Sequence, residues 1–130
     1  MIYLDSSAIT KLVVDEPHSA ALGTWLTTRA TSARVTSEIA TLEVRRACRR
    51  ISSAFVEEAE LFLAGLDLVY LDQAIMQRAS RLDPVELGSL DALHLASALT
   101  VEADLTVFVT YDQQLSRAAR AAGLSVSAPK

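Results

Sequence analysis

Short apolar runs alternate with longer amphipathic segments along the whole chain. The runs at residues 1–4, 34–36, 66–71 and 105–110 are short enough to be buried strands, and a shorter run follows at 124–126. Between them apolar residues recur at helical spacing, as in Ile39, Leu42, Val44 and Ala47. This alternation predicts an α/β fold with a short, mostly parallel sheet of four or five strands, covered by helices on both faces.

Capping residues, glycine and proline place the ends of the helices. We expect helices at 6–14, from about Pro17, from Ser37 to Ile51, from Ser52 or Ser53 to Gly65, at 72–82, at 89–99 and at 112–122. Ser6 and Ser7 are the expected caps of the first helix, and Gly123 is expected to end the last. No repeat, low-complexity run or linker divides the 130 residues, so they are predicted to form a single domain.

Composition narrows the class of protein. A hydrophobic content of 51% argues against disorder, and no apolar run is long enough to span a bilayer. The N-terminal segment lacks a basic stretch, so no signal peptide is expected. The single cysteine, Cys48, excludes an internal disulfide framework and is expected to pack as a small apolar residue. These features suit a cytoplasmic protein without a membrane partner.

The net charge of −4 does not by itself suggest a nucleic-acid-binding protein. However, four of the 16 acidic residues lie at strand ends or on helices where they could form a site, and the other 12 balance the 12 basic residues. Net charge therefore neither supports nor excludes an RNA substrate.

The four special acids are Asp5, Glu43, Asp91 and Asp112. Asp5 ends the first strand, Asp112 follows the strand at 105–110, Asp91 opens a helix, and Glu43 lies inside one. Ligands of open α/β sheets bind outside the carboxyl ends of the strands, so at least Asp5 and Asp112 are expected at one site. The alternative is that these acids are separate helix caps, and that Glu43 pairs with Arg46 on a solvated face.

Clustered carboxylates point to a hard cation. Mg²⁺ and Mn²⁺ prefer oxygen ligands, and phosphodiester hydrolysis can use such ions to activate water and to stabilise the leaving oxygen. Without a cation the cluster is costly, since two charges about 5 Å apart repel by roughly 3 kcal/mol at an effective dielectric constant near 20.

The chain resembles the PIN-domain ribonucleases, and most closely the VapC-type toxins of type II toxin–antitoxin modules. The segments that carry the resemblance are Ile-Tyr-Leu-Asp-Ser-Ser-Ala at 2–8, Thr-Leu-Glu-Val at 41–44, Leu-Asp-Ala-Leu-His-Leu-Ala-Ser-Ala at 90–98 and Val-Thr-Tyr-Asp at 109–112. It implies metal binding and catalysis by Asp5, Glu43, Asp91 and Asp112, with supporting hydroxyls at Ser6 and Thr110. It also implies a Mg²⁺- or Mn²⁺-dependent endoribonuclease.

The resemblance has consequences for partners too. It implies a homodimer, a cognate VapB-type antitoxin and a toxin–antitoxin hetero-oligomer. Helices near Phe55, Val56, Phe62 and Leu63 are implied to form the groove for the antitoxin peptide, which commonly places a basic side chain near the acids.

Basic and histidine side chains near these motifs have two interpretations. Two i, i+4 rows on the Glu43 helix are formed by Arg45, Arg46, Arg49 and Arg50. They are interpreted as an RNA phosphate contact, as a solvated face balanced by Glu38 and Glu43, or as a contact with an acidic partner. His94, one turn after Asp91, is interpreted as a partly buried helix histidine that hydrogen-bonds a neighbour, in preference to a proton shuttle or phosphate contact.

Other classes of protein fit the sequence less well than a metal-dependent ribonuclease does. A PIN-like scaffold that binds RNA or a protein without cleaving would not need all four acids. A receiver domain would need a lysine after a late strand, and none lies between Lys11 and Lys130. A haloacid-dehalogenase-type phosphatase would have a second aspartate where Ser7 stands, and no glycine-rich phosphate loop is present. The RNA target cannot be read from the sequence.

Overall fold

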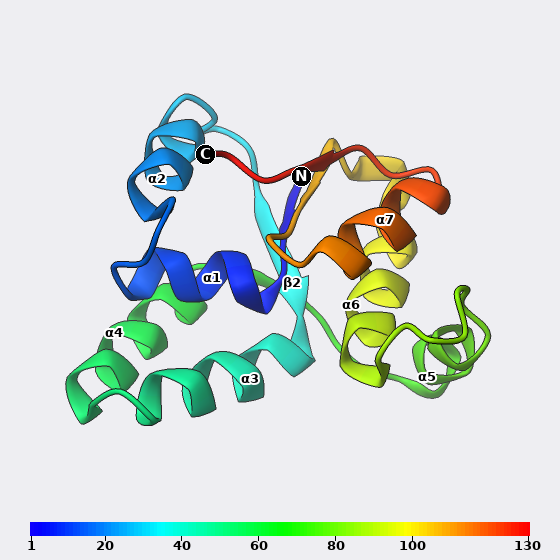
Figure 1. The fold of residues 1–130 in the computed structure, drawn as a ribbon, viewed down its shortest axis with the longest axis horizontal. Helices are drawn as coiled ribbons and strands as arrows, with labels where there is room; N and C mark the ends of the chain where they lie inside the picture. The colour runs from blue at the N-terminus through cyan, green and yellow to red at the C-terminus, as the bar shows by residue number, and fades with distance from the viewer.

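The computed structural model describes all residues 1–130 and has a single parallel sheet at its centre (Figure 1). Its strands lie in the order β3-β2-β1-β4-β5, and every neighbouring pair is parallel. Their bounds are β1 (Ile2–Leu4), β2 (Arg34–Ser37), β3 (Asp67–Val69), β4 (Val107–Val109) and β5 (Val126–Ser127). The predicted α/β class and parallel sheet are confirmed.

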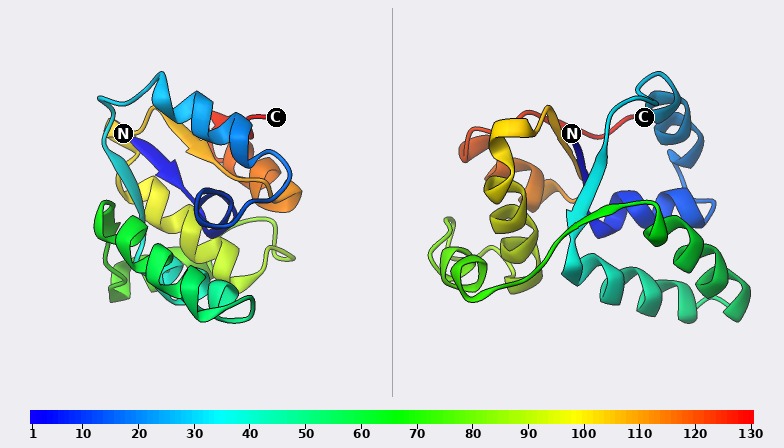
Figure 2. Two further views of the ribbon diagram at one scale, coloured as in Figure 1. Left: turned by 90° about the vertical axis from the view of Figure 1, so that its left-hand side faces the viewer. Right: turned by 180° about the vertical axis from the view of Figure 1, so that it is seen from behind.

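Helices cover both faces of the sheet, as Figures 1 and 2 show. One face carries α1 (Ser6–Val13), α2 (Ser19–Thr27), α3 (Glu38–Arg49) and α4 (Ser53–Ala64). The other carries α5 (Gln73–Ser80), α6 (Ser89–Thr100) and α7 (Gln113–Ala121), with a 3-10 turn at Glu102–Asp104 before β4. No helix is long and apolar enough to cross a membrane.

Side chains of successive strand residues enter two separate cores. Ile2 and Leu4 pack with the apolar side chains of α1 to α4, whereas Tyr3 packs with Phe108 and with side chains of α6 and α7. This alternation follows from the two-residue period of a strand, and it explains why the strands are apolar on both faces. Cys48 is fully buried in the first core, as predicted.

Helix starts agree with the sequence in most places and differ in two. Ser37, Asp72 and Asp112 cap their helices through side-chain hydrogen bonds, as expected. The first helix, however, is capped by Asp5 and not by Ser6 or Ser7. The second begins at Ser19 and not near Pro17, because His18 takes a left-handed conformation, with φ 74°.

Candidate functional site

The candidate site lies where the strand order of the sheet reverses. From β1 the chain continues to β2 and β3 on one side, and then crosses to β4 and β5 on the other. The carboxyl ends of β1 and β4 therefore flank the reversal point, which is where open α/β sheets bind ligands. Asp5 follows β1 directly and Asp112 follows β4, so both acids are at this point.

Asp5 is buried and held by three donors. Its carboxylate accepts hydrogen bonds from Ser7 Oγ (2.6 Å), the Ala8 amide (2.9 Å) and Thr110 Oγ1 (2.5 Å). Burial raises the pKa of Asp5, although His94 and these donors favour the charged form. Asp5 thus combines the cap of α1 with a fixed position at the strand end.

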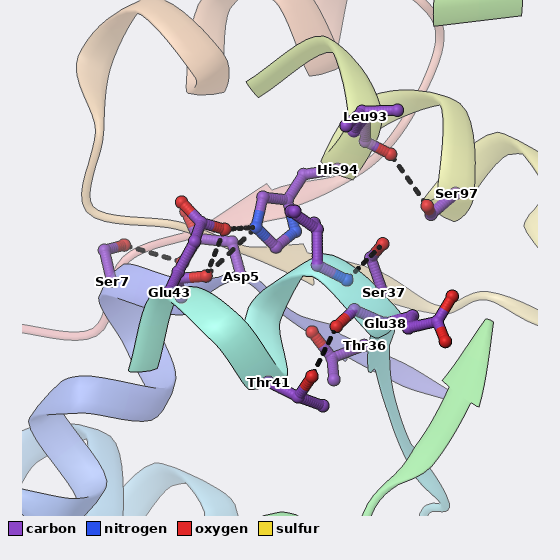
Figure 3. Close-up of polar contacts among 12 residues, drawn as sticks. Asp5, Ser7, Thr36, Ser37, Glu38, Thr41, Glu43, Leu93, His94 and Ser97 are labelled. Atoms are coloured by element: carbon purple, nitrogen blue, oxygen red, sulfur yellow. Dashed lines mark hydrogen bonds and ion pairs between the residues drawn. The ribbon is translucent and has the colours of Figure 1, made fainter. Parts of the chain in front are cut away.

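Glu43 points from α3 toward the start of α1 and toward α6. Its Oε1 accepts a hydrogen bond from His94 Nε2 at 2.7 Å, which Figure 3 shows, and another from Ser6 Oγ at 2.7 Å. Partial burial raises the pKa of Glu43, but hydrogen bonds from His94 and Ser6 outweigh burial and leave the pKa below its usual value. The alternative pairing of Glu43 with Arg46 is wrong, because no ion pair joins the two side chains.

His94 connects Glu43 to the sheet. The imidazole is buried, with 2% of its surface exposed, and its Nδ1 lies 2.8 Å from the Tyr3 hydroxyl. When the Tyr3 hydroxyl donates to Nδ1, Nε2 carries a hydrogen and donates it to Glu43. Tyr3 is itself fixed by stacking on Phe108 at a ring-centroid distance of 4.9 Å. His94 therefore hydrogen-bonds neighbours, as predicted, and one of those neighbours is a candidate site acid.

The pKa of Asp91 depends on burial and on the charges of the other three acids. Asp91 lies in the first turn of α6, and its side chain lies over the N-cap residue Gly88. A Cβ atom added to Gly88 would be 3.9 Å from Asp91 Oδ2. Burial raises the pKa of Asp91, and the charges of Asp112, Asp5 and Glu43 raise it further. Asp5 and Asp112 do cap their helices, whereas the side chains of Asp91 and Glu43 make no capping hydrogen bond, so the interpretation as four separate helix caps holds for only two of the acids.

The donor chemistry of these acids fits a hard divalent cation. All four supply carboxylate oxygens, and their mutual repulsion at Asp91 is what a cation would relieve. The side chains as they stand do not bring three such ligands together around one point, since Glu43 is turned to His94 and Asp112 caps α7 through the Leu115 amide. Binding would require these side chains to rotate toward a common ion.

A hollow of about 640 Å³ opens beside the acids. Glu43 and Asp112 line it together with the basic side chains of Lys11, Arg46 and Arg50. Arg45 does not reach it, because its guanidinium makes a two-bonded contact with Glu60 on α4 at 2.5 and 3.0 Å. Only one of the two predicted arginine rows therefore faces the site, and Arg49 lies on the other.

A comparison with protein-family models matches residues 2–121 to the PIN domain. The chain belongs to the PIN-domain family. It is 44% identical to Ribonuclease VapC46 of Mycobacterium tuberculosis over 128 residues, which cover 98% of this chain and 97% of that protein. It is 38% identical to Ribonuclease VapC47 of the same species, over 99% and 97% of the two chains. Within the PIN family it is therefore of the VapC type, and the resemblance seen in the motifs is confirmed.

Solved structures of PIN-domain proteins share the fold. VapC20 of M. tuberculosis, described as a toxin that cleaves the sarcin-ricin loop, superposes with a TM-score of 0.77 at 16% identity, covering 99% of this chain and 100% of that one. VapBC2 of Rickettsia felis, solved with a DNA fragment from its promoter, gives 0.77 at 16% identity over the whole of both chains. At this identity the likeness concerns the fold.

Two residues of this PIN-domain site were missed in the sequence. Ser7 donates to Asp5 and also accepts from the Tyr111 amide at 3.0 Å, so it joins the ends of β1 and β4. Tyr3 holds His94. A signal for Tyr3 was available, because a tyrosine in a fully buried strand needs a partner for its hydroxyl. Ser7 offered none beyond its place next to the acid motif.

Proposed function

We propose that this PIN-domain protein is a Mg²⁺- or Mn²⁺-dependent endoribonuclease that acts as the toxin of a VapBC-type toxin–antitoxin pair. Three observations support the proposal: Asp5 and Asp112 follow β1 and β4 at the reversal point of the sheet, Glu43 lines the same hollow as Asp112, and the pKa of Asp91 is raised by burial and by the charges of Asp112, Asp5 and Glu43. Its relatives over nearly the full length are named Ribonuclease VapC, which supports the same activity.

In this proposal the four carboxylates hold the metal. When bound, the divalent cation would supply activation of water and neutralisation of the charge that develops on the phosphate. The protein's own contribution at Asp5 is to fix the ligand, because Ser7 and Thr110 hold its carboxylate. Ser6 and His94 hold Glu43 in its metal-free orientation, from which the carboxylate would turn to the ion. Such outer partners orient ligands and commonly affect metal affinity as strongly as tenfold or more.

We assign the positioning of the RNA backbone to the basic side of the hollow. Arg46 and Arg50 line it beside Lys11, whereas Arg45 is neutralised by Glu60. Arginine suits phosphate because its planar fork makes paired hydrogen bonds. Of the four arginines of α3, the pair Arg46 and Arg50 is thus the one we expect to contact substrate.

Control of the toxin would come from an antitoxin. Structural neighbours include VapBC assemblies from R. felis and from Haemophilus influenzae, and both assemblies pair VapC with VapB by name. A basic side chain of such a partner would be attracted to the acids and would compete with a metal for them. We also propose a homodimer, as the family resemblance implies.

RNA cleavage by the purified, antitoxin-free chain tests the proposal. Total RNA is incubated with Mg²⁺, with Mn²⁺ or with EDTA, and the Asp91→Asn variant is compared with Asp67→Asn, which removes an exposed acid of β3. Cleavage that needs metal, persists in Asp67→Asn and vanishes in Asp91→Asn supports the proposal. Folded protein that binds RNA without cleaving it, in every metal, would favour the non-cleaving scaffold.

A further inference from the structure

A polar stripe along α7 lies next to the candidate site. Gln113, Ser116, Arg117 and Arg120 are spaced as one face of a helix, and the opposite face, with Leu115, Ala118 and Ala119, is buried in the second core. The four polar residues line a hollow of about 300 Å³. Its remaining lining residues are Thr110, Tyr111, Asp112, Ala128 and Lys130.

The basic side chains of this hollow have no acidic partner. No carboxylate lies within ion-pair distance of Arg117 or Arg120, and the one side-chain contact of Arg120 is with Ser116 Oγ at 2.9 Å. Asp112 is the single acid in the lining, and its Oδ1 is occupied by the cap of α7. In a chain with four more acids than bases, two unpaired arginines on one exposed face are a local excess of positive charge.

The two hollows meet at Tyr111 and Asp112, which line both. Away from these residues the larger hollow runs between α1 and α3 to Arg46 and Arg50, while the smaller one runs along α7 to Arg117 and Arg120. Asp112, which lines both hollows, therefore lies between two basic regions. Arg117 lies about 7 Å and Arg120 about 12 Å along the helix axis from Asp112, so the second region begins close to the acids.

We infer that Arg117 and Arg120 form a second phosphate-binding subsite, which holds the RNA backbone on the α7 side of the cleavage site. The inference rests on the proposed nuclease function, because it assumes that the bound polyanion passes the acids. An RNA strand would then be gripped on both sides of the scissile bond, by Arg46 and Arg50 on one side and by α7 on the other. Contacts of this kind fix register and are independent of base sequence.

Binding of a fluorescein-labelled, single-stranded oligouridylate tests the inference without turnover. Affinity is measured by fluorescence anisotropy in EDTA over a range of KCl concentrations, for the full chain, Arg117→Gln/Arg120→Gln, and the matched control Arg78→Gln/Arg81→Gln. The control removes two exposed arginines at the end of α5, with the same change in charge. Loss of two phosphate contacts should lower the slope of log affinity against log salt by about 1.4 in magnitude, whereas the control should leave it unchanged.

Further variants and probes separate the other outcomes. Arg117→Lys/Arg120→Lys retains both charges and should keep the slope, and thermal melts establish that each variant is folded. An equal salt slope for the glutamine variant and its control would overturn the subsite. The proposed nuclease function would still stand in that case if the unaltered chain cleaves RNA. A glutamine variant that loses affinity for poly-glutamate, with RNA affinity unaltered, would overturn it in favour of an acidic protein partner. If the unaltered chain neither binds nor cleaves RNA, the proposed function fails as well.

Discussion

In the folded, metal-free chain the ionised form of Asp91 is less favoured than usual relative to the protonated form. Its pKa is raised by burial and by three neighbouring acids, so folding favours the protonated form. The stability that this group contributes is present below its ordinary pKa of 3.8 and is lost as pH rises through the higher pKa of the folded state. At neutral pH the site therefore costs stability that a bound cation would restore.

An Asp91→Asn variant should reveal this cost. Because asparagine does not titrate, the melting temperature of the variant in EDTA, relative to the unaltered chain, should rise by about 1–3 °C between pH 4 and pH 7, a range that allows for solvent screening of a half-exposed group. Differential scanning calorimetry over this pH range measures the change. Asp67→Asn, which removes an exposed acid, serves as the control, and a pH-independent difference for Asp91→Asn would contradict the electrostatic coupling.

The Tyr3 hydroxyl should matter through His94. Tyr3→Phe keeps the ring that stacks on Phe108 but leaves Nδ1 of the buried His94 without a donor. We expect the free energy of unfolding to fall by about 1–3 kcal/mol, which is the usual cost of an unsatisfied buried polar group. Urea denaturation measures it, and Tyr70→Phe is the control, since Tyr70 is 68% exposed. Equal stability of the two variants would show that His94 is satisfied in another way.

At the scale of elements, α3 carries two arginine rows with different roles. Arg45 joins α3 to α4 through Glu60, in a contact whose side chains are about half exposed, at 47% and 49%. Such exposed pairs contribute little to stability, because solvent and salt screen the two charges. Arg46 and Arg50 line the larger hollow and have no acidic partner. A single helix thus supplies a structural contact on one row and a candidate substrate contact on the other.

Single substitutions in the two rows should separate these roles. Arg46→Gln should lower the salt slope of RNA binding by about 0.7, as expected for one phosphate contact with a single strand. Arg45→Gln removes the same charge and should leave the slope unaltered, with little change in stability because its ion pair is exposed. Anisotropy titrations with oligouridylate at several salt concentrations measure both. The same slope for the two variants would contradict the division of the rows.

The order and type of the elements could be predicted from the sequence, because strand and helix periodicities differ clearly in this chain. The first cap could not be assigned, since Asp5, Ser6 and Ser7 are all good cap residues and the choice depends on where β1 ends. The partner of Arg45 could not be found either. Glu60 lies on a different helix, and only the packing of α3 against α4 brings the two side chains together.

At the scale of the whole molecule, the sheet order creates the site. Because β1 is paired with β4, Asp5 after β1 and Asp112 after β4 stand at the same edge of the sheet. The charges of Asp112, Asp5 and Glu43 add to burial in raising the pKa of Asp91 on α6. The pattern predicted that Asp5 and Asp112 share one edge of the sheet, since residues at strand ends are visible in the sequence, and the metal-binding role of all four acids stays a prediction. It did not show the strand order, which decides that Asp5 and Asp112 flank the reversal point, nor the contacts of Tyr3 and Ser7 that hold the acids.

Mn²⁺ binding tests the central claim, that these four acids form one divalent-metal site, most directly. The disappearance of the free-ion signal in electron paramagnetic resonance gives the affinity of the metal-free chain, of Asp5→Asn, of Asp91→Asn and of the control Asp67→Asn. Saturable binding should be retained by Asp67→Asn and weakened at least about tenfold by each site variant, as expected for loss of an ordering group or ligand. Absence of binding by the folded chain, or equal binding by all four proteins, would contradict a metal site at Asp5, Glu43, Asp91 and Asp112.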